Sequence, residues 1–294
     1  MGKISQQVES GRILLSDGAW GTFLHQKGLS TGQCPEIWNV DRPDDVLDIA
    51  RSYVIAGSNM IETNSFGGSR FKLEAYGLED RVTELNRAAA EISREAAGED
   101  RYVLGSIGPT GKFVVMGDVS AKELYDAFSE QAAALATGGV DAIIVETMSD
   151  IQEATAAVQA ASENTDREII CTMTFEPADD GTYYTIMGVT PAQMAETLIE
   201  MNVDIIGANC GTGFRHMADI TREIRTVNTD IPILIHANAG APVFRDGETV
   251  FPETPDDMAS GIPELIEAGA NIIGGCCGTT PEYITKFAET IRNS

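Results

Sequence analysis

Three cysteines in two glycine-rich turns are the residues of this chain best suited to chemistry. Cys210 lies in the segment Asn209-Cys210-Gly211, and Cys276 and Cys277 lie in the segment 274–281. Each segment follows a short apolar run, so we expect the three thiols at the ends of two buried strands. Three thiolates with one open position suit a zinc ion that binds and activates a sulfur-containing substrate. The motif therefore predicts a catalytic zinc centre with Cys210, Cys276 and Cys277 as its ligands.

The other two cysteines are interpreted as ordinary core residues. Cys171 lies inside an apolar run and Cys34 precedes a proline in a loop, and a free cysteine commonly packs as a small apolar side chain. Five cysteines, no signal peptide and no apolar run of membrane length indicate a reduced, cytoplasmic protein. In that compartment an adjacent cysteine pair favours metal binding over a crosslink.

The composition narrows the classes of partner. The 294 residues include 45 acidic and 20 basic side chains, which gives a formal net charge of −25. No basic patch or run stands out, which argues against nucleic acid and anionic membranes as partners. A solvated acidic surface is the favoured interpretation; a saline cytoplasm or a partner with a basic face are the alternatives. No apolar extension or coiled-coil segment predicts the oligomeric state.

One sequence pattern occurs four times along the chain. A helix ends at a glycine, an Asn or Asp follows, and a hydrophobic strand then ends in polar residues. The pattern covers residues 56–63, 138–147, 202–210 and 268–276. Four further strands are expected at 13–17, 102–107, 168–175 and 231–237.

Amphipathic helices are expected between these strands. Their clearest ranges are 80–97, 121–136, 191–200, 217–227 and 281–292. Eight buried strands alternating with helices predict a (β/α)8 TIM barrel that forms a single domain over residues 1–294. An open doubly wound sheet is the alternative, because strand count does not prove closure. The long loops 18–42, 108–120 and 240–255 follow strands one, three and seven, on the face where a barrel builds its active site.

Polar residues at the strand ends would meet at that face. We expect the substrate-binding residues to be Asp17, Gly18, Ala19, Glu62, Asn64, Ser106, Glu146, Asn209 and Asn238. Carboxylates beside a zinc–thiolate centre suit a substrate with an ammonium group, and the backbone amides after Asp17 suit its carboxylate. The hypothesis is a zwitterionic amino acid that carries a thiol.

Each of these residues also has a simpler interpretation. Asp17 and Asn238 are equally typical of turns or helix caps, and Glu62 and Glu146 are equally suited to pairing with arginines at the rim. The three histidines, His25, His216 and His236, are interpreted as structural. Trp20 and Trp38 flank the first long loop and either line the site or pack within the loop.

Together these motifs resemble the homocysteine S-methyltransferase family, and within it the homocysteine-binding module of cobalamin-dependent methionine synthases. The matching segments are 17–22, 62–66, 105–110, 146–148, 209–211, 238–240 and 274–284. Ala237 departs from the pattern, because the family commonly has proline before Asn-Ala-Gly. The resemblance implies a (β/α)8 barrel, zinc held by the three cysteines, and homocysteine with its thiolate in the open zinc position. It also implies that Asp17 and Glu146 hold the amino group, and that Asn238 lies near the metal.

The segment after Cys277 and the hairpin expected at 246–250 resemble the cobalamin branch of the family. That branch implies methionine synthesis with a methylated corrinoid as the methyl donor. The sequence contains no cobalamin, folate or reactivation module, so the chain is expected to be an excised fragment or to work with a separate corrinoid protein. The alternatives are betaine, S-methylmethionine or another small donor, a different thiol acceptor in a demethylation pathway, or a zinc-binding redox sensor. A sensor needs no amino-acid pocket, so the strand-end residues argue against it.

Overall fold

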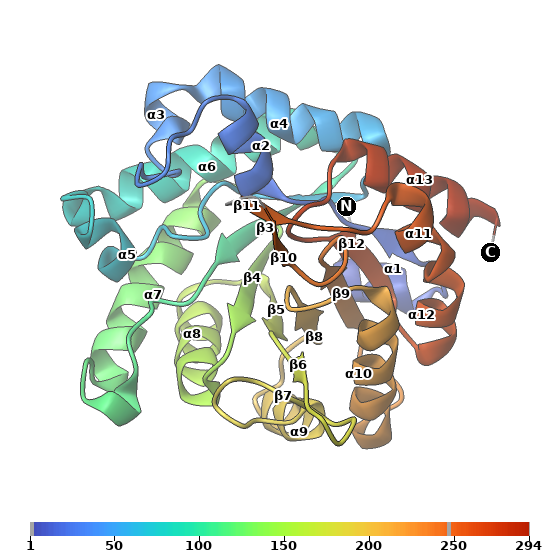
Figure 1. The fold of residues 1–294 in the computed structure, drawn as a ribbon. Helices are drawn as coiled ribbons and strands as arrows, with labels where there is room; N and C mark the ends of the chain where they lie inside the picture. The colour runs from blue at the N-terminus through green and yellow to red at the C-terminus, as the bar shows by residue number, and fades with distance from the viewer. Residues whose placement is uncertain (1–2, 246–247, 294) are drawn as a thin grey trace.

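A parallel barrel of eight strands forms the centre of the protein (Figure 1). The computed structural model describes residues 3–245 and 248–293. The strands follow the order β1-β12-β9-β8-β5-β4-β3-β2 around the barrel. They are β1 (Leu14–Leu15), β2 (Met60–Glu62), β3 (Tyr102–Ile107), β4 (Ala142–Met148), β5 (Glu168–Met173), β8 (Ile205–Asn209), β9 (Ile233–Ala237) and β12 (Ile272–Gly275).

Eight helices surround the barrel, one after each strand. They are α4 (Pro43–Ala56), α6 (Val82–Ala97), α7 (Ala121–Thr137), α8 (Ile151–Asn164), α9 (Pro191–Glu200), α10 (Phe214–Val227), α12 (Ile262–Ala268) and α13 (Pro281–Asn293). The predicted (β/α)8 barrel is therefore confirmed, and the open sheet is not what the chain forms. Within the described residues, no helix is both long and apolar enough to cross a membrane.

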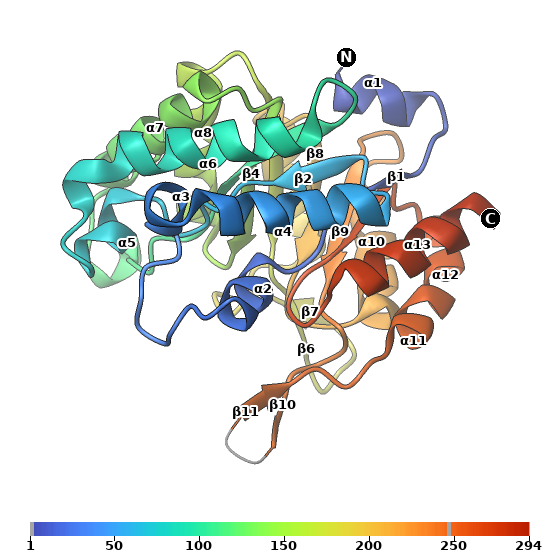
Figure 2. The ribbon, with the colours of Figure 1, turned by 90° about the horizontal axis from the view of Figure 1, so that it is seen from above.

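Smaller elements decorate the two ends of the barrel. They are α1 (Ile4–Glu9), α2 (Trp20–Gln26), α3 (Trp38–Asp41), α5 (Arg70–Glu74), α11 (Pro255–Ser260), the 3-10 turns η1 (Glu79–Arg81) and η2 (Val114–Met116), and the hairpins β6–β7 (Glu176–Pro177, Tyr183–Tyr184) and β10–β11 (Val243–Arg245, Glu248–Val250). Helix α1 lies at the end of the barrel opposite to the β10–β11 hairpin (Figure 2). The hairpin expected at 246–250 is present as β10–β11, although residues 246–247 lie outside the described residues.

The apolar core has two layers, inside and outside the barrel wall. Every barrel strand contributes to the inner layer, which α1 closes from below with Ile4 and Val8. Its strand residues are Leu14, Met60, Tyr102, Leu104, Ala142, Ile144, Ile170, Ile205, Leu234 and Ile272. The outer layer joins the other faces of the strands to the surrounding helices. Because side chains alternate along a strand, the apolar inner positions fix which later residues point inward.

The repeated sequence pattern performs one structural task four times. Its Asn or Asp stands just before a strand and bonds twice to the strand beside it. Asn271 shows the arrangement: its amide N–H donates to the carbonyl of Ile233, and its Oδ1 accepts from the Ile233 N–H, both at 2.9 Å. Asn59, Asp141 and Asp204 bond in the same way to Leu15, Val103 and Ile169. We call these four the strand-start residues.

The residue two places before each strand-start residue has a left-handed backbone. It is glycine at positions 57, 139 and 269, with φ of 109°, 96° and 108°, whereas Asn202 takes the same role with φ of 58°. Only glycine and, less readily, asparagine tolerate this region, which ends the helix and turns the chain into the strand. The sequence pattern thus ends a helix and then fixes the first residue of the following strand to its neighbour.

The seam between β1 and β2 is closed mainly by side chains. These two strands are neighbours at the ends of the strand order and share no backbone ladder in the described chain. Instead, Asn59 bonds to Leu15, the Ser58 hydroxyl donates to the carbonyl of Ser16, and the amide of Glu62 donates to the Asp17 carboxylate at 2.8 Å. The observed β1 is shorter than the expected 13–17, although the Ser16 amide still donates to the carbonyl of Ile273 and the Gly275 amide to that of Asp17, both at 2.8 Å.

Candidate active site

The three motif cysteines come together above the carboxyl ends of β8 and β12. Their Sγ atoms lie within 4.8 Å of one another, and all three residues are partly buried. Strand β9 lies between the two turns and holds both: the Cys210 amide donates to the carbonyl of His236, and the Cys276 amide donates to that of Ala237. The backbone of Cys210 is left-handed with φ of 62°. Such strain in a non-glycine residue is typical of functional sites.

The ionisation of these thiols favours a bound cation. Hydrogen bonds from Cys276 and Cys277 lower the pKa of Cys210, so that its sulfur is the first to become a thiolate. The pKa values of Cys276 and Cys277 are raised, chiefly because each thiol donates a hydrogen bond to Cys210. Without added positive charge, burial and the mutual repulsion of the sulfurs therefore oppose ionisation of all three thiols together. Three thiolates at this spacing need a metal ion to neutralise them.

The donor set fits zinc. Tetrahedral zinc with Zn–S bonds of about 2.3 Å sets the sulfurs roughly 3.8 Å apart, and the observed separations, none above 4.8 Å, are compatible with that spacing. Asn238 follows β9 beside Cys210, and its buried Oδ1 has no hydrogen-bond partner in the described structure. An unsatisfied buried oxygen beside three sulfurs is a suitable additional contact for a metal.

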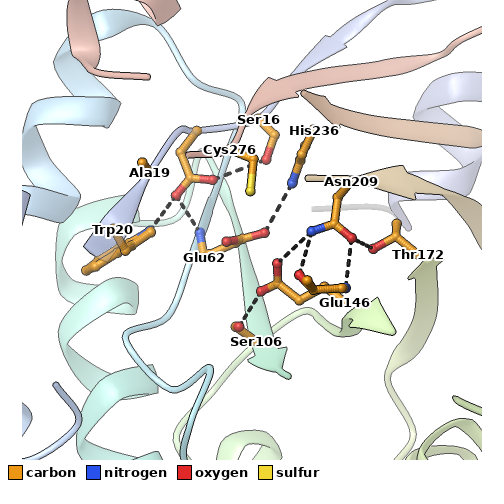
Figure 3. Close-up of polar contacts among 12 residues, drawn as sticks. Ser16, Ala19, Trp20, Glu62, Ser106, Glu146, Thr172, Asn209, His236 and Cys276 are labelled. Carbon is orange, nitrogen blue, oxygen red and sulfur yellow. Dashed lines mark hydrogen bonds and ion pairs between the residues drawn. The ribbon is translucent and has the colours of Figure 1, made fainter. Parts of the chain in front are cut away.

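A cavity of about 320 Å³ opens beside the cysteines. The cavity belongs to the polar layer immediately above the apolar barrel core, because its inward-facing residues stand two places after the inner apolar positions. Met60 is followed by Glu62, Leu104 by Ser106, and Ile144 by Glu146. The same alternation brings Thr172, Asn209 and His236 into this layer (Figure 3). The strand period therefore determines which polar side chains meet.

Glu146 is fixed by two neighbours in this layer. The Ser106 hydroxyl donates a short hydrogen bond to Oε1, and the Asn209 amide donates to Oε2 at 3.4 Å. Asn209 is itself held, since its Oδ1 accepts from the Thr147 amide and the Thr172 hydroxyl, both at 2.7 Å. The carboxylate is thereby oriented without a cationic partner among the described residues.

Asp17 and Glu62 are two further buried carboxyl groups, with Glu62 in the cavity wall and Asp17 beside it. The Asp17 Oδ2 accepts from the Trp20 indole N–H at 2.9 Å and from the Glu62 amide at 2.8 Å. The Glu62 Oε1 lies 3.3 Å from the His236 Nδ1 (Figure 3). Gly18 itself lies close to Thr279, because a Cβ at position 18 would lie 2.7 Å from the Thr279 hydroxyl.

The electrostatics of this layer are those of an uncompensated acidic pocket. Burial raises the pKa of Asp17, Glu62 and Glu146, and their mutual repulsion raises the values of Glu62 and Glu146 further. Burial also lowers the pKa of His236, so the one nearby imidazole is uncharged near neutrality. Three buried carboxyl groups, those of Glu36, Glu62 and Glu146, are in the cavity wall, Asp17 is buried beside it, and no lysine or arginine lines it. Such a pocket favours a ligand that brings a positive charge.

Most of the expected substrate-binding residues line the cavity. Gly18, Ala19, Glu62, Asn64, Ser106 and Glu146 are in its wall with the three cysteines. Asp17, Asn209 and Asn238 are buried beside the wall and are not part of it. No arginine pairs with Glu62 or Glu146 in the described chain. Trp20 lines the cavity, whereas Trp38 is buried elsewhere with the Arg42 guanidinium 3.8 Å above its ring.

His236 and Phe66 are cavity residues to which the sequence analysis gave no role in the site. His236 was interpreted as structural; its ring faces Glu62, and its Nε2 is buried without a partner in the described structure. The strand period contained this signal, because His236 stands two places after the inner residue Leu234. His25 and His216 are not in the cavity wall. Cys34 and Cys171 are buried away from the cluster.

Comparison with known proteins gives a consistent picture. The profile of the family described as Homocysteine S-methyltransferase matches residues 14–291. The methionine synthase of Mycobacterium tuberculosis is 35% identical over 300 residues, covering 97% of this chain and 25% of the relative. The methionine synthase of Mycobacterium leprae is 33% identical over 296 residues, covering 95% and 24%. The chain thus spans about a quarter of the length of these curated relatives.

Solved structures show the same fold. The metallated form of the Escherichia coli homocysteine methyltransferase MmuM superposes with a TM-score of 0.78 at 22% identity, covering 97% of this chain and 98% of that one. Its apo form gives a TM-score of 0.74, covering 95% of each chain. The carboxyl transferase domain of Rhizobium etli pyruvate carboxylase with 3-bromopyruvate gives 0.53 at 16% identity, covering 98% and 49%. At these identities the likeness concerns the barrel alone.

Proposed function

The chain belongs to the homocysteine S-methyltransferase family, a family of methyltransferases, and from that premise we propose a specific reaction for it. Residues 1–294 act as one catalytic module that binds zinc and homocysteine and accepts a methyl group from a methylated corrinoid to form methionine. The observation that carries this proposal is the coincidence, in one cavity, of three clustered thiols with the buried carboxyl groups of Glu36, Glu62 and Glu146, and with no lysine or arginine among the lining residues.

The cysteines would hold the metal. Cys210, Cys276 and Cys277 are the ligands, and Asn238 is the neutral oxygen beside them. When bound, zinc supplies the positive charge that lets a substrate thiol ionise near neutral pH. The turns that carry the cysteines are held by backbone bonds to β9. They therefore fix the sulfur atoms relative to the pocket before substrate arrives.

The pocket residues would bind the amino-acid part of homocysteine. Glu146, oriented by Ser106 and Asn209, faces the cavity and accepts the ammonium group. Asp17 supports the same region through Trp20 and the Glu62 amide, and the backbone amides that follow it are offered to the substrate carboxylate. Binding the ammonium group provides the charge that the buried carboxyl groups lack.

The methyl group then passes in one displacement. The substrate sulfur, as thiolate, attacks the methyl carbon, the new S–C bond forms as the Co–C bond breaks, and the electron pair of that bond stays on cobalt. The chain contributes ionisation and alignment of the nucleophile, which are separate and large effects. No general base is needed at the moment of transfer.

A methyl-transfer assay tests this proposal. Zinc-loaded protein is given L-homocysteine with methylcobalamin, betaine or S-methylmethionine in parallel, and methionine is quantified by mass spectrometry. We expect methionine with methylcobalamin, together with loss of its absorbance. Turnover only with betaine or S-methylmethionine would replace the corrinoid by a small donor. Turnover with none of the three would leave a protein-bound corrinoid or a different thiol as the substrate.

Matched cysteine variants show whether the cluster is responsible. Cys277→Ala is expected to bind no zinc tightly and to lose at least 1000-fold in activity, on the order of 4 kcal/mol of transition-state stabilisation. Cys171→Ala removes a thiol buried in β5, away from the cluster, and should retain a full equivalent of zinc. Retained zinc and turnover in Cys277→Ala would rule out the three-thiolate centre.

A further inference from the structure

Two segments from opposite ends of the sequence meet at the cavity. The pocket loop, residues 17–22, carries Asp17 and supplies five consecutive residues of the cavity wall. The cysteine turn, residues 275–279, carries Cys276 and Cys277. In the proposed reaction the pocket loop holds the amino-acid end of homocysteine, and the cysteine turn holds its sulfur. The distance between the two segments therefore sets the length of the thiol that fits.

The hydroxyl group of Thr279 joins these two segments. Its Oγ1 accepts a hydrogen bond from the Ala19 amide at 3.2 Å and donates one to the carbonyl of Cys276 at 2.7 Å. Ala19 and Thr279 are 260 residues apart in the sequence, and Thr279 is fully buried. A hydroxyl group can donate one hydrogen bond and accept others. This one uses both functions to tie the pocket loop to the backbone of a candidate metal ligand.

Two glycines provide the space that this hydroxyl occupies. A Cβ at Gly18 would lie 2.7 Å from the Thr279 Oγ1, and a Cβ at Gly275 would lie closer still. Neither glycine has a left-handed backbone, so these positions need glycine for its small size and not for its conformational freedom. The pocket loop and the cysteine turn thus each lack a side chain at the point where the hydroxyl stands between them.

Two further hydrogen bonds hold the pocket loop in place. The Tyr53 hydroxyl, from α4, donates to the carbonyl of Ala19 at 2.7 Å, and the Gly275 amide donates to the carbonyl of Asp17 at 2.8 Å. Tyr53 is fully buried. Buried networks in which every member has a partner make a local structure rigid. Of these contacts, the one through Thr279 continues directly to the carbonyl of Cys276.

We propose that Thr279 is a positioning residue that sets the spacing between the pocket loop and the cysteine turn and thereby selects the chain length of the thiol substrate. Thr279 is not in the cavity wall, so it acts through the Ala19 amide and the Cys276 carbonyl. This inference rests on the proposed function, because it takes zinc and homocysteine as the ligands. It does not depend on the identity of the methyl donor.

A valine at position 279 would change this spacing in a defined direction. A methyl group would replace the hydroxyl, which lies 2.7 Å from the Cys276 carbonyl oxygen. Close contacts of carbon with a carbonyl oxygen lie at about 3.3–3.6 Å, so the pocket loop and the cysteine turn must move apart. We expect zinc-loaded Thr279→Val to bind homocysteine about 10-fold more weakly, because its two ends are no longer held at the correct distance. The variant should keep a full equivalent of zinc.

The preference for chain length is the measurement that a purely structural role would not change. L-Homocysteine and its next homologue, which has one more methylene group, are titrated by calorimetry into zinc-loaded protein. The ratio of the Kd for the longer thiol to that for homocysteine should fall about 10-fold in Thr279→Val, the size of effect that one methylene group commonly has. Thr279→Ser keeps the hydroxyl and should reproduce both wild-type affinities.

Thr221→Val is the matched control for loss of a buried hydroxyl. Thr221 is also fully buried, but its hydroxyl donates to Met217 within the same helix, α10, so its affinities should equal those of the wild type. Tyr53→Phe tests the proposal independently of position 279. It removes the bond to the Ala19 carbonyl and should weaken homocysteine binding while zinc is retained.

Several results would overturn the positioning role. They are wild-type affinities in Thr279→Val, equal losses in Thr279→Ser and Thr279→Val, and loss of zinc from Thr279→Val, which would make the hydroxyl part of the metal site. If Thr279→Val does not fold, an unchanged homocysteine affinity in Tyr53→Phe has the same meaning. Zinc-loaded wild-type protein that binds no homocysteine tells against the proposed function itself, and so the two failures are distinguishable.

Discussion

At the scale of single residues, the pocket combines groups that are unfavourable together until a ligand binds. Glu146 is buried and hydrogen-bonded to Ser106 and Asn209, but no described cation neutralises it. His236, the nearby imidazole, has a pKa lowered by burial and so brings no charge near neutrality. A charged group held in this way is stable only when its partner arrives. Ligand affinity is thus obtained at the expense of the ligand-free protein's stability.

Glu146→Gln should stabilise the ligand-free protein at neutral pH. Burial, and then the charge of Glu62, raise the pKa of Glu146 in the folded state. A carboxyl group with a raised folded pKa contributes its stability fully below its unfolded pKa, and that contribution is lost as the pH rises through the folded value. Glutamine keeps the side-chain oxygen and cannot ionise. We expect a gain at pH 7.5 on the order of 1 kcal/mol, roughly 2 °C in Tm, and no gain at pH 4.

Thermal unfolding at both pH values measures the stability of the ligand-free protein, and isothermal titration measures its affinity for homocysteine. Glu146→Gln should bind homocysteine at least 10-fold more weakly while retaining its zinc, because the ammonium group loses its carboxylate. Glu196→Gln, at an exposed position on α9, should give the same small Tm difference at both pH values. Unchanged homocysteine affinity in Glu146→Gln would remove the carboxylate from the ammonium site.

At the scale of elements, the four strand-start residues explain how short strands keep their register. Each donates its backbone N–H to the neighbouring strand and accepts a hydrogen bond from it through its side-chain oxygen, at the point where the ladder begins. Asn271 does this with Ile233. The sequence pattern indicated where these helices stop and strands begin. It did not indicate the cross-strand bonds, because Asn271 and Ile233 are 38 residues apart and only the folded barrel makes them neighbours.

Removing one of these residues should loosen the barrel measurably. Asn271→Ala leaves the buried amide of Ile233 without its acceptor and also removes an acceptor of Arg225. We expect a loss of about 1–3 kcal/mol in the free energy of unfolding in urea. Asn271→Asp is the matched control, since aspartate performs the same task at positions 141 and 204, and it should retain most of the stability. Equal losses in both variants would contradict this account.

The elements that the sequence did not predict are short ones. Helix α1 has two buried residues, Ile4 and Val8, so its apolar period appears only once. The β6–β7 hairpin has strands of two residues, and so no alternation is visible in it. Both depend on contacts with distant parts of the chain. By contrast, β3, with six buried residues, was predicted at its observed bounds.

At the scale of the whole molecule, the barrel separates stability from chemistry along its axis. The carboxyl end holds the cysteines and the carboxylates. The opposite end is closed by α1, whose Ile4 and Val8 cover the inner apolar layer. Glu168 fixes this helix by accepting from the amide and hydroxyl of Ser5. Substitutions at the carboxyl end should therefore change activity, and substitutions at the α1 end should change the free energy of unfolding.

Ile4→Ala tests this separation. The fully buried side chain leaves a cavity at the barrel floor, and we expect a loss of about 2–5 kcal/mol in the free energy of unfolding. The kcat/KM for homocysteine at 25 °C should remain at the wild-type value while the protein is folded. Gln6→Ala, at an exposed position on the same helix, should leave both unchanged. A loss of kcat/KM without loss of folded protein would show that the two ends are coupled.

How far the sequence predicts the site follows from the same geometry. The strand period and the strand ends identify inward-facing polar residues such as Glu62 and Glu146, because these depend on local pattern alone. The local pattern does not predict which side chains from non-adjacent strands meet across the barrel. The contact of Glu62 with His236 joins β2 and β9, which are not adjacent in the sheet, and the position of Asp17 beside the wall depends on the amide of Glu62.

The β1–β2 seam has a consequence for how this protein can evolve. Asp17 joins β1 to β2 as well as being a candidate binding residue. Its carboxylate accepts a hydrogen bond from the Glu62 amide, where no backbone ladder joins the two strands. A new residue at position 17 changes the closure of the fold and the pocket in one step, so selection cannot adjust them separately. Thr22 lines the same cavity, and its side chain makes no hydrogen bond within the described residues. Adaptation to a different thiol substrate is therefore less constrained at Thr22 than at Asp17.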